Sequence, residues 1–281
     1  MTFNMKTRTV ADQTRYQRMT TAELRESFLI EDLFQIGSVE LYYTDVDRAV
    51  IGSIVPAGKK LALGTSKEQL AAEYFAERRE IGLINTGAAG NVIVDGKSFV
   101  LENCDGLYVG RGSKQIEFES RNSADPARFF LMSYPAHASY PTAHAKKANA
   151  EATNLGSVKD ANQRTIYKYI HPKGIASCQL VMGFTQLKEG SIWNTMPPHT
   201  HSRRTEVYLY FNLDPSARVF HMMGTPAETR HLLVKNGQAV ISPSWSIHAG
   251  AGTQNYSFIW AMGGENQAFD DMDPAPITEL R

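Results

Sequence analysis

The 281-residue sequence has only two cysteines, Cys104 and Cys178. Two thiols are too few for a disulfide framework or a thiolate metal site, so we expect both to be buried and free. Acidic and basic residues balance at 29 each, which leaves no net charge to attract nucleic acid or an acidic membrane. No stretch approaches the ~20 apolar residues of a membrane span, and the N-terminus lacks the apolar core of a secretion signal. These absences predict a soluble, cytoplasmic protein without nucleic-acid or membrane partners.

The chain does contain many short runs of alternating apolar and polar residues, separated by turn residues. Before them, Leu24, Phe28 and Leu29 have helical spacing, so one short helix is expected within residues 11–35, with Thr20 or Thr21 as its N-cap. Strands are expected at 39–43, 49–55, 80–85, 91–94, 99–101, 106–109, 115–119 and 127–132, and again at 165–170, 178–185, 206–211, 218–223, 231–234, 238–242 and 257–262. Such a pattern is typical of all-β barrels and sandwiches.

The two sets of strands predict two domains. Residues 135–163 show little alternation and are interpreted as a connector. The segments 90–96 and 105–112 resemble 234–245, which indicates a weak internal duplication. Two tandem β-barrels are therefore expected, residues 1–150 and residues 151–281. No histidine precedes His137, so the first barrel is expected to bind no metal and to serve packing or assembly.

The clearest chemical signal is a set of four potential metal ligands. His199 and His201 are two residues apart, which in a strand directs both side chains to one face. The next four residues allow a turn, after which Glu206 can enter from a strand, and His248 follows in Pro243-Ser-Trp-Ser-Ile-His. Three imidazole nitrogens and one carboxylate suit a divalent transition metal such as zinc, iron, manganese or nickel.

The longer motifs resemble the 5-keto-4-deoxyuronate isomerase family, whose members are also called 4-deoxy-L-threo-5-hexosulose-uronate ketol-isomerases. The resemblance rests on residues 74–80, 193–201, 219–224, 228–231, 241–248 and 264–273 and extends over nearly the whole chain. It implies a double-cupin fold, a step in pectin and uronate breakdown, and one zinc ion per chain in the C-terminal barrel. It also implies that His199, His201, Glu206 and His248 are the ligands, that the substrate is a small keto-deoxyuronate, and that the protein is a homo-oligomer, a hexamer.

An aldose–ketose isomerisation needs a Lewis acid, a proton-transfer group and a cation for the substrate carboxylate. A metal held by four protein ligands can supply the first only if a coordination position opens; otherwise the site is structural. Tyr208 and Tyr210 share a strand face with Glu206, so either can reach the substrate or belong to the core. Lys168 and Arg230 are the candidates for the carboxylate. We place Lys168, Arg230 and Tyr210 in the expected catalytic set.

Other charged residues near these motifs have more ordinary interpretations. Arg203 and Arg204 flank the ligands and can pair with acidic neighbours, and His221 is either a core histidine or a base. The run Glu77–Glu80 is interpreted as a solvated face available for subunit contacts. Two other functions use the same ligands: an iron-dependent cupin dioxygenase, and a cupin that binds uronate without converting it. Loss of turnover without oxygen would favour the dioxygenase.

Overall fold

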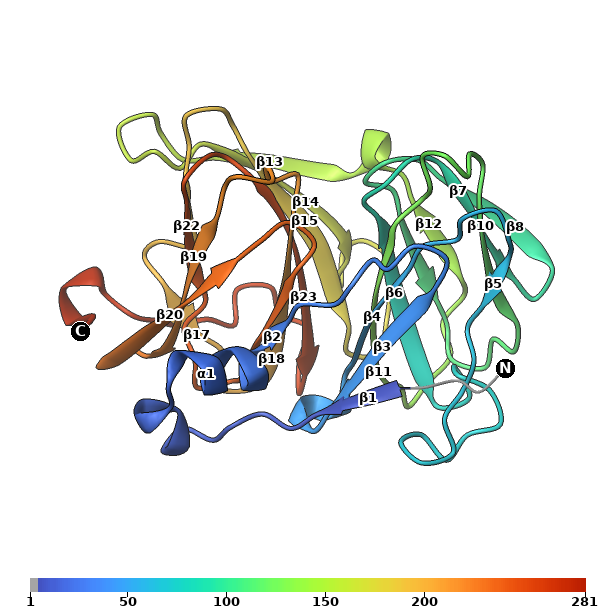
Figure 1. Cartoon of the computed structure of the whole chain (residues 1–281), viewed down its shortest axis with the longest axis horizontal. Helices are drawn as coiled ribbons and strands as arrows, with labels where there is room; N and C mark the ends of the chain where they lie inside the picture. The colour runs from blue at the N-terminus through green and yellow to red at the C-terminus, as the bar shows by residue number, and fades with distance from the viewer. Residues whose placement is uncertain (1–4) are drawn as a thin grey trace. The chain divides into compact units, whose positions relative to one another are not determined.

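The structure is a computed structural model that describes residues 5–281, and strands dominate it (Figure 1). About 43% of the chain is strand and 8% is helical, so the expected all-β class is confirmed. The chain forms two compact units. The first contains Asp32–Ala150, Tyr169–Val181 and the described residues up to Arg8; the second contains Thr9–Glu31, Glu151–Lys168 and Met182–Arg281. Residues 9–31 thus belong to the second unit although they precede most of the first, and residues 169–181 belong to the first although they lie in the second half of the chain. No single cut in the chain separates the units.

The first unit contains a seven-stranded and a four-stranded sheet. The larger sheet has the order β1 (Met5–Arg8), β3 (Val39–Thr44), β4 (Val50–Ile54), β11 (Phe129–Pro135), β6 (Arg79–Asn85), β9 (Gly106–Val109) and β12 (Ala143–Ala145). The smaller has the order β5 (Leu61–Ala62), β10 (Ile116–Ser120), β7 (Gly90–Val94) and β8 (Lys97–Leu101). Their facing apolar side chains, including Ile81, Leu83, Val92, Phe118 and Phe129, form a continuous core.

The second group of sheets repeats this arrangement. Its larger sheet has the order β13 (Glu151–Leu155), β14 (Arg164–Ile170), β15 (Val181–Leu187), β23 (Ser257–Gly264), β18 (Arg204–Phe211), β21 (Ala239–Ser242) and β2 (Leu29–Ile30). Its smaller sheet has the order β16 (Trp193–Asn194), β22 (Ala249–Gly252), β19 (Val219–Thr225) and β20 (Glu228–Val234). A short pair, β17 (His199–Thr200) with β24 (Asp273–Pro274), has no counterpart among the named strands of the first unit.

The repeat is visible in individual residues as well as in strand order. Strand β6 begins with Arg79 and the corresponding strand β18 begins with Arg204, and both side chains are buried. Arg79 donates to the backbone carbonyls of Arg48 and Ser133, and Arg204 donates to those of two residues after β23. Carbonyl groups that satisfy a buried guanidinium lower the cost of its burial. The two groups of sheets therefore share their strand order and a buried arginine at the same position in it.

The expected helix is confirmed as α1 (Thr21–Phe28), and Thr20 is its N-cap. The Thr20 side chain accepts from the Glu23 N–H while the Glu23 carboxylate accepts from the Thr20 N–H, which forms a capping box. The apolar side of the helix buries Leu24 and Phe28 and contacts β20 and β21. The remaining helical segments are 3₁₀ turns at Arg15–Arg18, Val46–Arg48, Lys147–Asn149 and Ile277–Glu279.

Asp95 and Gly96 form a tight turn. Asp95 and Gly96 connect β7 to β8 with φ angles of 47° and 83°, the left-handed pair that a tight hairpin requires and that glycine adopts without strain. No helix among residues 5–281 is both long enough and apolar enough to cross a membrane.

Three sequence interpretations need correction. The connector expected at 135–163 contains the strands β12 and β13. The run from Glu77 to Glu80 is not a solvated face throughout, because Arg79 and Glu80 are buried. Glu80 accepts hydrogen bonds from the N–H groups of residues 178–180 at 2.7–2.8 Å and from the Tyr108 hydroxyl at 2.8 Å, so its charge is satisfied inside the first unit. Of the cysteines, both are free, but only Cys104 is fully buried.

Candidate metal centre

The second unit brings the four predicted ligands to one point. Their ligand atoms all lie within 4.8 Å of one another. His199 lies in β17, His201 follows that strand directly, Glu206 lies in β18, and His248 immediately precedes β22. The expected turn between His201 and Glu206 is present at residues 202 and 203. Strand β17 is too short to include His201, yet the two imidazoles still converge, because the chain stays extended up to the turn.

The separations are those of a coordination shell. The Nε2 atom of His199 lies 3.1 Å from Nε2 of His201 and 3.0 Å from Nε2 of His248. The Glu206 Oε2 atom lies 2.9 Å from His201 Nε2 and 2.8 Å from His248 Nε2. Three ring nitrogens and one carboxylate oxygen of this kind are the donor set of divalent transition metals.

The tautomer of His201 tests whether a cation fits between these atoms. Its Nδ1 lies 2.8 Å from the backbone carbonyl oxygen of Asp271, which can only accept, so Nδ1 carries the proton. A neutral His201 therefore directs the Nε2 lone pair at the Glu206 carboxylate, 2.9 Å away. Two lone pairs at this distance repel each other unless a positive charge lies between them. The residues present thus fit a bound divalent metal, with His201 positioned as metal-bound histidines usually are.

Burial and neighbouring charges shift the pKa values of the cluster toward the forms that bind a cation. Burial, together with the neighbouring His248, lowers the pKa of His199 to about 3, so its ring is neutral at ordinary pH. Burial alone would raise the pKa of Glu206, but the adjacent His248 holds that pKa well below its usual value. A neutral imidazole and an ionised carboxylate are the forms that bind metal.

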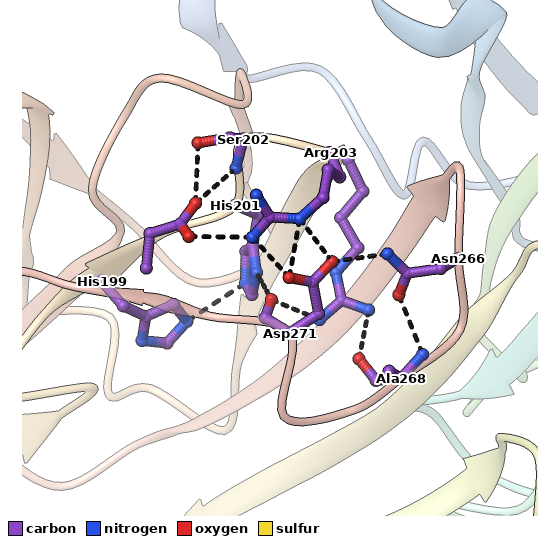
Figure 2. A network of polar contacts seen from close by, with 9 residues as sticks. His199, His201, Ser202, Arg203, Asn266, Ala268 and Asp271 are labelled. Atoms are coloured by element: carbon purple, nitrogen blue, oxygen red, sulfur yellow. Dashed lines mark hydrogen bonds and ion pairs between the residues drawn. The ribbon is translucent and has the colours of Figure 1, made fainter.

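A segment that follows β23 holds the ligand turn in place (Figure 2). The Asp271 carboxylate accepts from Arg203 Nε at 2.8 and 2.9 Å and from Arg203 Nη2 at 2.5 Å. Asp273 accepts from Arg203 Nη2 at 2.8 Å and from both the N–H and the hydroxyl of Ser202. Arg203 holds the pKa of Asp271 and that of Asp273 below their usual values, so both carboxylates stay ionised. The two residues that follow His201 are therefore fixed by charged hydrogen bonds.

The buried Arg204 binds the same segment. Its guanidinium donates to the carbonyl of Ala268 at 2.7 Å and to that of Asp271 at 3.0 Å (Figure 2). The Asp271 carbonyl thus accepts from both Arg204 and His201. Arg203 pairs with acidic residues, as expected from the sequence, whereas Arg204 is buried and binds main-chain oxygens instead.

A cavity of about 300 Å³ opens beside the cluster. Apolar and aromatic side chains form most of its wall. Its lining consists of Leu155, Arg164, Ile166, Thr185, Thr195, Met196, Pro197, His199, His201, Glu206, Tyr208, Phe258, Trp260, Met262, Phe269 and Met272. An apolar cavity with a small number of convergent polar groups is the usual form of a small-molecule site.

The two candidate tyrosines occupy different positions. Tyr208 lines the cavity, and its hydroxyl lies 3.1 Å from the Thr195 hydroxyl. Tyr210, from the predicted catalytic set, lies outside the lining and is fully buried, with its hydroxyl 2.7 Å from Nδ1 of His221. Burial raises the pKa of both phenols well above the ordinary value, so both keep their protons. Gly250 leaves the room for this packing, because a Cβ there would lie 3.1 Å from the Tyr210 hydroxyl.

The two predicted carboxylate-binding cations also lie outside the cavity lining. Lys168 is 3.6 Å from a Glu151 oxygen and sits over the Phe269 ring at 4.8 Å from its centroid. Arg230 donates to the backbone carbonyl of Gln17 and lies 3.9 Å from Glu228. Their catalytic roles, like that of Tyr210, stay predictions.

Sequence reasoning did not identify Arg164, the cation that does line the cavity. It is the first residue of β14 and pairs across the hairpin with Leu155. The available signal was the alternation of β14, in which residues 164, 166 and 168 share a face. Residue 164 was placed before the expected strand and was therefore overlooked.

Comparison with known proteins shows the family of the chain. Residues 41–277 match the KduI/IolB family. The chain is 52% identical over 277 residues to the 4-deoxy-L-threo-5-hexosulose-uronate ketol-isomerase of Caldicellulosiruptor bescii, with 99% of this chain and 100% of the relative covered. A protein of the same name from Lacticaseibacillus paracasei is 49% identical over 282 residues, with both chains covered completely.

Solved structures show the same fold at low sequence identity. An IolB-like protein from Salmonella typhimurium superposes with a TM-score of 0.68 at 14% identity, covering 85% of this chain and 94% of that protein. The oxalate decarboxylase of Lactobacillus farciminis superposes with a TM-score of 0.55 at 9% identity, covering 85% and 88%.

Proposed function

The chain belongs to the KduI/IolB family, and from this premise we propose that it is a 4-deoxy-L-threo-5-hexosulose-uronate ketol-isomerase. It converts 5-dehydro-4-deoxy-D-glucuronate to 3-deoxy-D-glycero-2,5-hexodiulosonate in the catabolism of pectin-derived uronates. The observation that carries the proposal is the match of full-length relatives of this name to a chain whose four potential metal ligands converge beside a cavity.

The reaction interconverts an aldehyde and a ketone on neighbouring carbons. A proton leaves the hydroxyl-bearing carbon, and negative charge develops on the oxygens of the resulting enediolate. A proton returns to the former aldehyde carbon, and the hydroxyl proton passes from the oxygen that becomes the ketone to the oxygen that becomes the alcohol. A divalent metal, when bound, supplies a Lewis acid that stabilises this charge. His199, His201, Glu206 and His248 are the residues that would hold it.

We assign Tyr208 a role on the substrate oxygens. Its hydroxyl lines the cavity and lies in hydrogen-bonding range of Thr195. Because burial raises the pKa of this phenol well above its ordinary value, Tyr208 stays protonated and acts as a donor. A donor directed at developing negative charge in an apolar cavity contributes most in the transition state. The apolar wall, which includes Phe258 and Trp260, excludes water from the reacting carbons.

The finer features of the proposal follow the family resemblance. We propose zinc as the metal, one ion per chain, and a tandem double-cupin fold. The repeated strand order of the two groups of sheets supports the tandem fold. A hexameric assembly and a cytoplasmic location stay predictions.

The direct test is conversion of the uronate by the purified protein, followed by NMR. The aldehyde signal should disappear as the keto-sugar forms, at the same rate with and without oxygen. Elemental analysis of the same sample should give one zinc per chain. A protein that leaves the uronate unchanged would contradict the proposed function, and turnover that requires oxygen would favour the dioxygenase.

A further inference from the structure

One cationic side chain borders the cavity beside the ligand cluster. Of the residues that line it in the described part of the chain, Arg164 is the only lysine or arginine. The surrounding wall is largely apolar, and the acidic group in it, Glu206, belongs to the ligand cluster. The lining therefore contains one guanidinium in addition to three of the potential metal ligands.

Arg164 has little to neutralise its charge. Within residues 5–281 its contact is a hydrogen bond from Nη1 to the backbone carbonyl of Asn162 at 2.9 Å, and no carboxylate pairs with it. The residue is half-buried, and burial lowers the pKa of its guanidinium. A guanidinium has five N–H donors, so most of its hydrogen-bonding capacity is open to a ligand.

The other two candidate cations are occupied by the protein itself. Lys168 is paired with Glu151 and covered by the Phe269 ring. Arg230 is bound to the main chain at Gln17 and lies near Glu228. Neither borders the cavity, so neither can reach an anion in it without leaving these partners.

We propose that Arg164 binds the carboxylate of the uronate and makes the cavity selective for acidic over neutral keto-sugars. The inference rests on the proposed function, because that function supplies the carboxylate. A planar guanidinium can take a carboxylate through two parallel hydrogen bonds, and the apolar wall strengthens the ion pair by excluding water.

The position of Arg164 also orients the substrate. The carboxylate and the aldehyde are at opposite ends of the sugar chain. With the acid held at Arg164, the aldehyde end is the one left to face the metal ligands and Tyr208. Arg164 is thus a specificity-determining residue that positions the reacting carbons without touching them.

The test compares two variants, Arg164→Met and Arg164→Lys, on two substrates. The substrates are the uronate and its primary amide, in which the carboxylate charge is removed. The matched control is Arg218→Met, because Arg218 also donates to local carbonyls, at Pro215 and Ala217, but does not border the cavity. Zinc content and circular dichroism of each variant establish that the metal centre and the fold are intact.

For the uronate, Arg164→Met should lower kcat/KM about ten- to a hundred-fold, chiefly through KM. Arg164→Lys should retain part of the activity, because it keeps a charge but loses the paired hydrogen bonds. For the amide, wild type and Arg164→Met should differ by less than about threefold, since the lost interaction requires a charged partner. Arg218→Met should behave as wild type does on both substrates.

Equal losses on the uronate and the amide would overturn the inference, and so would wild-type efficiency of Arg164→Met on the uronate. Failure of the proposed function is recognised separately, because wild-type protein would then leave the uronate unconverted. In that event calorimetric binding of the two compounds decides: the uronate should bind wild type more tightly than the amide does, and Arg164→Met should abolish that difference. A difference that persists in Arg164→Met would exclude Arg164 as the carboxylate site.

Discussion

Replacing His221 should remove much of the acid sensitivity of the fold. His221 lies on β19 and is 0% exposed, with Nδ1 bound to the Tyr210 hydroxyl at 2.7 Å and Nε2 without a partner among the described residues. Burial, and secondarily His248, lowers the pKa of His221 from 6.5 to about 3. Between these two values the unfolded chain binds a proton that the folded chain does not. The folded state therefore loses stability as the pH falls below 6.5.

The size of the effect follows from that shift. A group that is charged in the unfolded state and neutral in the folded state costs about 1.4 kcal/mol for each pH unit below its unfolded pKa. Between pH 7.5 and 4.5 the His221 contribution amounts to about 2.7 kcal/mol of unfolding free energy. His221→Asn keeps a polar group near the Nδ1 position, does not titrate in this range, and should lack that contribution.

The assay is urea unfolding of wild type and His221→Asn at pH 7.5 and pH 4.5, with the metal removed from both proteins by a chelator. Removing the metal is necessary because protons also compete for the ligand histidines. The variant will be less stable at both pH values, since a smaller side chain leaves a cavity, but its loss between them should be smaller by about 2.7 kcal/mol. Equal losses in the two proteins would show that His221 takes up its proton in the folded state.

Three further outcomes are expected. Elemental analysis of the double variant His199→Ala/His248→Ala should show loss of the bound metal, because the two remaining donors cannot complete the coordination shell. Full metal content in this variant would exclude the cluster as the metal site. Tyr208→Phe should lower kcat with little change in melting temperature. Tyr210→Phe should retain kcat but lower the unfolding free energy by about 1–3 kcal/mol, because it leaves the buried imidazole of His221 without its hydrogen bond. The reverse pattern would make Tyr210 the catalytic phenol. Glu80→Gln should destabilise the first unit by about 1–3 kcal/mol without altering KM, and a changed KM with unchanged stability would contradict a structural role.

Three of the four potential metal ligands could be predicted from the sequence because few residues separate them. His199, His201 and Glu206 lie within one turn and two strand segments, where alternation and turn length largely decide which side chains meet. The strands could also be predicted, because alternation is a property of neighbouring residues. Most of the expected strands appear within one or two residues of their predicted bounds. Very short strands such as β16 and β17 were missed, since two residues cannot show a period.

Charge interactions between distant segments could not be predicted from the sequence. Arg79 and Glu80 stand in a run of four charged residues, which is ordinarily a solvated surface. Glu80 is buried because residues 178–180 supply three N–H groups from almost a hundred positions along the chain. A sequence pattern contains side-chain identities but not the positions of remote N–H groups, so nothing local to Glu80 indicated this partner.

The environment of His201 shows the same limit at the site itself. Its proton is placed by the main-chain carbonyl of Asp271, which residue identity does not determine. What identity does determine is the carboxylate of Asp271, which binds Arg203 and so holds that carbonyl in position. The side chain of Asp271 therefore acts on the metal ligand only through its own backbone. The side-chain charge and the backbone contact of residue 271 are separable in this arrangement: any side chain that kept the turn bound to Arg203 would leave the His201 tautomer, and hence its Nε2 lone pair, unchanged.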